Sequence, residues 1–128
     1  MKNVLIIAAH PDDELLGCGG TVARHINEGD KVHFLIMAEG ATARYKDRKE
    51  GKHTEAEKLF ECSREVSQFL GAEEPIFGRL HDNRMDSYDF LDIVKIIEKI
   101  SSAINPQIVY THHGNDLNID HQLTHRAA

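Results

Sequence analysis

The sequence predicts an α/β fold, in which an open, mostly parallel sheet carries helices on both faces. Four short apolar segments of strand type alternate along the chain with longer segments whose apolar residues recur at helical spacing. The first apolar segment, residues 4–9, shows no polar alternation, which is typical of a strand buried on both faces. With right-handed crossovers, the order βαβαβαβα gives a Rossmann-like sheet in a single domain over residues 1–128.

The same two patterns predict the remaining elements in order. A helix begins near Glu14, where Asp12 or Asp13 can cap it, and ends at Gly29. Further strands are expected at residues 31–38, 75–80 and 107–111, and further helices at 54–70, from Ser87 or Asp89 to 104, and after His121. In the helix at 54–70 we place Phe60, Val66 and Phe69 on the apolar face.

Composition excludes several classes of protein. The chain has 128 residues, of which 41% are hydrophobic and 28% charged, an ordinary globular composition. Its net charge of −6 disfavours nucleic acid as a partner. No apolar run approaches the roughly 20 residues of a transmembrane segment, and no signal-peptide pattern precedes the first strand, so a cytoplasmic location is expected. Cys18 and Cys62 are then expected to be reduced thiols.

The first polar cluster directly follows the first predicted strand. His10, Asp12, Asp13 and Glu14 crowd one turn, and Pro11 makes the end of the strand sharp. Three adjacent carboxylates repel each other unless a cation neutralises some of them or the start of a helix accepts some of them. Both explanations remain open for this turn taken alone.

A second polar cluster favours the cation. His112, His113, Asp116, Asn118, Asp120 and His121 follow the last predicted strand. Ligands of open α/β sheets bind beyond the carboxyl ends of the strands, and parallel strands bring those ends to one edge. The two clusters therefore predict a metal site at that edge.

The two motifs resemble those of a known family. Residues 9–14, Ala-His-Pro-Asp-Asp-Glu, match the AHPDDE signature of the zinc-dependent de-N-acetylases called PIG-L or LmbE-like, and Asp120-His121 matches the second motif, which usually reads His-Pro-Asp-His. The resemblance implies a hydrolase that removes an N-acetyl group from an amino sugar or a sugar conjugate. Members are usually longer, so we expect this chain to lack the usual C-terminal portion, and a homo-oligomer through the uncovered sheet edge is an alternative.

The resemblance also implies roles for residues near the two motifs. His10, Asp13 and His121 would bind Zn²⁺, leaving positions open for water and substrate. Asp12 would be the general base and Asp120 an outer partner that orients an imidazole ligand.

Five further residues are expected at the substrate. Asp82 matches an acidic sugar-binding position of the family, and Arg44 is a candidate contact from a charged loop. Asn118 stands where the family often has a histidine; its amide can donate a hydrogen bond to an oxyanion but cannot act as an acid. His112 or His113 could replace that histidine.

Two other functions fit parts of the pattern. Two imidazoles and one carboxylate also suit Fe²⁺ or another divalent metal, so a non-haem iron oxygenase is an alternative. The spare carboxylate of Asp12 argues against it, because hydrolysis uses a base that oxygen activation does not need. The other alternative is a non-catalytic metal-binding domain or a truncated interaction domain.

Overall fold

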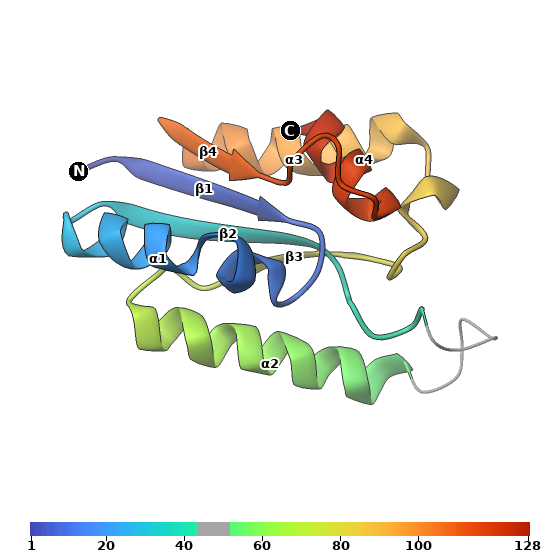
Figure 1. The fold of residues 1–128 in the computed structure, drawn as a ribbon, viewed down its shortest axis with the longest axis horizontal. Helices are drawn as coiled ribbons and strands as arrows, with labels where there is room; N and C mark the ends of the chain where they lie inside the picture. The colour runs from blue at the N-terminus through green and yellow to red at the C-terminus, as the bar shows by residue number, and fades with distance from the viewer. Residues whose placement is uncertain (44–51) are drawn as a thin grey trace.

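The computed structural model describes residues 1–43 and 52–128 and confirms the α/β fold (Figure 1). Four strands form one sheet, β1 (Asn3–Ala8), β2 (Lys31–Ala38), β3 (Ile76–Leu80) and β4 (Ile108–Thr111). Their order is β3-β2-β1-β4, and each neighbouring pair is parallel. The helices are α1 (Asp13–Asn27), α2 (Lys52–Leu70), α3 (Phe90–Ile104) and α4 (Ile119–Ala127), with a short 3-10 helix, η1 (Met85–Ser87), before α3.

Alternating residues of the central strand supply a core on each face of the sheet. Leu5 and Ile7 of β1 pack into the cluster that includes α3 and α4, whereas Val4 and Ile6 pack into the cluster beneath α1. Figure 1 shows α1 and α2 on one side of the sheet and α3 and α4 on the other. The uninterrupted apolar run of β1 therefore reflects burial on both faces.

The apolar face of α2 differs from the sequence prediction. Phe69 is 88% exposed, whereas Ser63 and Ser67 are buried beside Phe60. Positions 60, 63 and 67 share one side of a helix, and position 69 points elsewhere. Hydrophobic spacing does not identify serine as an inward residue, but the Ser67 hydroxyl can be buried because it donates to the Ser63 carbonyl.

The sheet places all four strand-to-helix loops at its carboxyl edge, because every strand pair is parallel. The end of α4 nearest this edge also differs from prediction, since the helix begins at Ile119 and contains His121 in its first turn. No helix within residues 1–43 and 52–128 is long and apolar enough to cross a membrane.

Candidate metal centre

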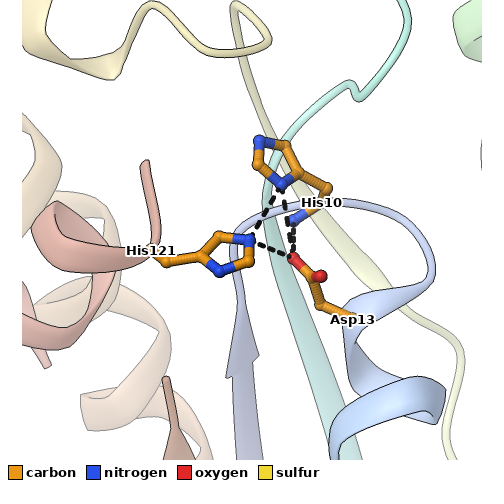
Figure 2. A group of neighbouring side chains, drawn as sticks. All are labelled: His10, Asp13 and His121. Atoms are coloured by element: carbon orange, nitrogen blue, oxygen red, sulfur yellow. Dashed lines mark hydrogen bonds and ion pairs between the residues drawn. The ribbon is translucent and has the colours of Figure 1, made fainter. Parts of the chain in front are cut away.

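Three side chains from different parts of the chain converge at the carboxyl edge of the sheet (Figure 2). His10 follows β1, Asp13 begins α1, and His121 lies in the first turn of α4. His10 Nδ1 lies 3.3 Å from Asp13 Oδ2 and 3.3 Å from His121 Nε2. The third side of the triangle, from His121 Nε2 to Asp13 Oδ2, measures 3.1 Å.

The turn after β1 holds His10 and Asp13 together. The backbone N–H groups of Asp12 and Asp13 donate to the His10 carbonyl, at 3.0 and 3.2 Å. The His10 N–H in turn donates to Asp13 Oδ2 at 2.9 Å. These hydrogen bonds make residues 10–13 a tight turn, which fixes the carboxylate of Asp13 beside the imidazole of His10.

Carboxylates behind the two imidazoles determine which ring nitrogens face the centre. Asp120 Oδ2 lies 2.9 Å from His10 Nε2, and Asp116 Oδ2 lies 3.0 Å from His121 Nδ1. In the neutral imidazoles these outer nitrogens carry the proton, because a carboxylate only accepts. The inner nitrogens and Asp13 Oδ2 then direct three lone pairs at one point, an arrangement that a cation relieves.

The spacing of these three atoms fits a tetrahedral metal. Zinc bonds of about 2.0–2.1 Å to nitrogen and oxygen, at tetrahedral angles, separate neighbouring ligand atoms by roughly 3.3 Å. The observed separations are 3.1–3.3 Å. The donor set and its geometry therefore fit a divalent ion such as Zn²⁺ without rearrangement.

The electrostatics of the cluster agree with a cation site. Burial lowers the pKa of His10, but Asp120 and Asp13 more than reverse this effect and raise the pKa from 6.5 to about 10. Burial raises the pKa of Asp13, but His10 and His121 outweigh it and hold that pKa below its usual value. The cluster thus attracts positive charge strongly, whether a proton or a metal.

Asp12 lies beside the triangle rather than in it. Its backbone has φ 153° and ψ −28°, a conformation that residues other than glycine rarely adopt. The Asp12 N–H donates to the buried carboxylate of Glu14 at 2.9 Å, and the Asp12 carbonyl accepts from Leu15 and Leu16. Partial burial and the nearby charge of Asp13 raise the pKa of Asp12, which suits a group that accepts a proton.

A groove of about 940 Å³ opens beside the triangle. Its lining includes His10, Asp12, Asp13, Asp82, Asn83 and Asn118, together with residues of α2. Asp82 is buried, and its Oδ1 lies 3.3 Å from His10 Nε2. Arg44 lies outside the described residues.

Asn118 serves the fold as the N-cap of α4. Its Oδ1 accepts from the backbone N–H groups of Asp120 and His121, and its Nδ2 donates to Asn83 Oδ1 at 2.7 Å. A histidine at this position could not cap in the same way, because the cap needs a short side chain with an oxygen. Asn118 also lines the groove, so its amide can still contact a substrate while it caps the helix.

His112 and His113 lie on the other side of the centre, in a separate cavity of about 380 Å³ beside α1 and β4. The His112 ring stacks on the His121 ring with centroids 3.9 Å apart, and its Nε2 accepts the Ala9 N–H at 2.8 Å. Burial and the neighbouring His121 lower the pKa of His112, so the ring is neutral. The structure therefore packs His112 against the proposed metal ligands, with its Nε2 3.6 Å from Asp13 Oδ2, and leaves both histidines outside the lining of the groove.

Three contributors to the centre received no role from the sequence. Asp116 orients His121, Asn83 connects Asp82 with Asn118, and Glu14 supports the turn at Asp12. Asp116 stood in the second polar cluster, and its spacing of five residues before His121 was the available signal. The role of Asn83 depends on a contact between two loops and had no local signal.

Comparisons with known proteins find a family match along nearly the whole chain. The family model described as GlcNAc-PI de-N-acetylase (PIG-L) matches residues 5–128. The uncharacterized deacetylase YaiS of Escherichia coli is 30% identical over 135 residues, which cover 99% of this chain and 66% of YaiS.

Two solved structures share the fold over nearly the whole chain. The N,N'-diacetylchitobiose deacetylase of Pyrococcus horikoshii superposes with a TM-score of 0.85 at 24% identity, covering 98% of this chain and 47% of the deacetylase. GalB, the 4-carboxy-2-hydroxymuconate hydratase of Pseudomonas putida, superposes with a TM-score of 0.82 at 26% identity, covering 100% of this chain and 54% of GalB. The chain thus spans about half the length of these two proteins.

Proposed function

Because the chain belongs to the PIG-L family, described as GlcNAc-PI de-N-acetylases, we propose that it removes an N-acetyl group from an amino sugar or a sugar conjugate with the help of a divalent metal. The observation that carries this proposal is the triangle of His10, Asp13 and His121 beside the groove that holds Asp12. Three protein ligands leave positions for water and substrate, as catalytic rather than structural sites do.

We assign Zn²⁺ to the triangle, and Fe²⁺ or another divalent ion is the alternative that the same ligands would hold. Such an ion, when bound, supplies a Lewis acid for the amide carbonyl and lowers the pKa of a bound water. Asp120 and Asp116 hold the two imidazoles in the orientation that this role requires.

Asp12 is the proposed base. Its carboxylate would take a proton from the water that attacks the amide carbonyl. The water oxygen bonds to the carbonyl carbon, the C–N bond then breaks, and the acyl group leaves as acetic acid, which ionises in solution. The amine nitrogen needs one proton. Asn118 cannot supply that proton because an amide does not titrate, so Asp12 returns the proton that it accepted. Its raised pKa favours this second role.

The groove offers hydrogen-bonding groups for a sugar. Asp82 can accept from a hydroxyl, and Asn118 can donate to the developing oxyanion. Arg44 stays a prediction outside the described residues, and substrate contacts by His112 or His113 stay predictions that require the substrate to reach beyond the groove. A small N-acetylated glycoconjugate is therefore the substrate class that we assign.

Metal analysis and an amine-release assay test the proposal together. The purified protein should bind one zinc and release a free amine from N-acetylglucosamine or one of its conjugates. Asp12→Asn should keep the zinc and lose the release. Turnover in metal-free protein would contradict the proposal, and tight zinc binding without turnover on any amide would favour the non-catalytic metal-binding domain.

A second candidate reaction is hydration, which the 26% identity with GalB favours. Both reactions need a water activated at one face of the substrate, and the groove does not distinguish them by ligand type. Assaying 4-carboxy-2-hydroxymuconate beside the N-acetyl sugars separates the two. A cytoplasmic location and self-association remain predictions, which fractionation and size-exclusion chromatography check.

A further inference from the structure

A buried carboxylate outside the metal centre links the two loops that form walls of the groove. Glu39 follows β2 and is 7% exposed. Its carboxylate accepts the Thr42 hydroxyl and the Ala41 N–H from the loop after β2, the latter at 3.2 Å. It also accepts the Asp82 N–H, at 3.4 Å, from the loop after β3. One side chain therefore gathers donors from two loops that are distant in sequence.

The two loops meet a second time at the groove itself. The Ala43 N–H donates to Asp82 Oδ2 at 3.1 Å, and Asp82 Oδ1 lies 3.3 Å from His10 Nε2. Gly40, Ala41 and Ala43 line one wall of the groove, and Asp82 and Asn83 line another. The position of Asp82 in the groove thus depends on the loop that Glu39 holds.

Close packing ties the same loop to the metal-binding turn. Gly40 has φ +72°, and a Cβ at this position would approach Pro11 Cδ to 2.7 Å. Only glycine can adopt this positive φ without strain and also leave Pro11, the neighbour of His10, in place. The wall formed by residues 40–43 consequently has little freedom to shift relative to the centre.

A purely structural role is the simpler explanation for Glu39, but the groups around its carboxylate favour a role in shaping the groove. Among the described residues, the one basic side chain within 4.0 Å of this carboxylate is that of His81, whose Nδ1 lies 3.8 Å from Glu39 Oε1. Burying a carboxylate costs free energy that hydrogen bonds must offset. An apolar side chain would fill this position more cheaply, yet it could not hold the two walls together.

We propose that Glu39 is a positioning residue that clasps the loops after β2 and β3 and thereby sets how the substrate lies against the metal ligands. Glu39 does not touch the metal triangle, so its effect passes through Asp82. The inference rests on the proposed function, because it assigns the groove to the substrate of that reaction.

Hydrogen exchange tests the clasp independently of turnover. Glu39→Ala should accelerate exchange of the Ala43 and Asp82 amides about tenfold. The Asp82 amide loses its acceptor, and the Ala43 amide donates to Asp82, which is then held less firmly. Thr42→Val keeps the shape of the buried side chain and removes one donor, so it should act in the same direction and more weakly. Glu98→Ala, an exposed change on α3, is the matched control and should change neither amide. Unchanged exchange in both test variants would overturn the clasp.

Steady-state kinetics test the positioning role. Glu39→Ala should raise the KM for the N-acetyl sugar about tenfold, leave kcat within about threefold and keep the bound zinc, because substrate placement and not chemistry is disturbed. A fall in kcat at unchanged KM, or loss of zinc, would overturn the role. If Glu39→Ala does not fold, the same comparison of KM with kcat in Thr42→Val tests the role. If the unmodified protein releases no amine from any amide, the proposed function fails while hydrogen exchange still decides the clasp.

Discussion

Two clusters of histidine and carboxylate residues lie at opposite ends of the sheet and differ in how their ligand atoms are used. The carboxyl-edge cluster consists of His10, Asp13 and His121, and the amino-edge cluster of His25, Glu28 and Asp30. In each cluster the ligand atoms lie within 4.8 Å of one another. Residue type and proximity alone would therefore nominate both as metal sites.

The atoms of the amino-edge cluster are already paired, either with each other or with groups outside the cluster. His25 Nδ1 lies 2.8 Å from Asp30 Oδ2, and His25 Nε2 lies 3.0 Å from the Tyr110 hydroxyl. Asp30 also accepts the Lys2 N–H, and Glu28 pairs with the exposed Arg24. These contacts connect α1 to β4, and the loop after α1 to the residue before β1, which is a structural role.

In the carboxyl-edge cluster, the hydrogen-bond partners of the two imidazoles lie on the side of each ring that faces away from Asp13. Asp120 and Asp116 engage the outer imidazole nitrogens, so the inner nitrogens point at Asp13. The two clusters thus contain the same types of residue, but only in the carboxyl-edge cluster are three lone pairs directed at one point, which is the feature that the proposed metal site requires.

Removing one histidine from each cluster should give the largest difference in zinc affinity between the two clusters. His121→Ala should weaken zinc binding about a thousandfold or more, since the loss of an outer partner alone costs roughly 10–100-fold. His25→Ala should leave zinc affinity unchanged and lower only the melting temperature. Isothermal titration of metal-free protein with zinc measures both. Equal losses in the two variants would remove the distinction between the clusters.

Asp12→Asn should separate chemistry from metal binding within the carboxyl-edge cluster. The amide cannot accept the proton, so kcat should fall about 10²–10⁴-fold while zinc content stays at the unmodified level. Amine release and metal analysis on the same preparation check this. Loss of zinc in this variant would show that Asp12 is a ligand and that the base lies elsewhere.

The outer carboxylates should have intermediate effects. Asp116→Asn leaves His121 in place but weakens its orientation, so zinc affinity should fall roughly 10–100-fold. Asp30→Asn is the matched change at the amino edge and should not alter zinc affinity. A competition assay with a chelating dye resolves differences of this size. An unchanged affinity in Asp116→Asn would mean that packing alone orients His121.

The smallest effect is expected at the amino edge. Tyr110→Phe removes the hydroxyl that faces His25 Nε2, which should cost about 1 kcal/mol in the free energy of unfolding and leave zinc binding unaffected. Urea denaturation of metal-free protein measures the cost. Zinc binding gained by this variant at a second site would show that Tyr110 had been blocking a metal site.

Local patterns accounted for the elements of the fold. Short-range rules predict the apolar run of β1, the strand at residues 31–38, and the ends of the first two helices at Gly29 and at residue 70. The exposed Phe69 shows where those rules stop, because the buried side of α2 accepts serine at the positions that face the sheet. Helix packing selects by size and direction as well as by hydrophobicity.

Residue patterns alone are enough to predict the α/β class, the two polar clusters and their resemblance to a family of deacetylases. The folded structure was needed to establish the strand order β3-β2-β1-β4, which places β4 beside β1 and brings position 121 to position 10. It also decided that Asp116 orients His121, that His112 packs behind it, and that Glu39 joins two loops. The physical reason is that periodicity and capping act over a few residues, whereas the direction of a lone pair depends on groups that meet only after the sheet has formed.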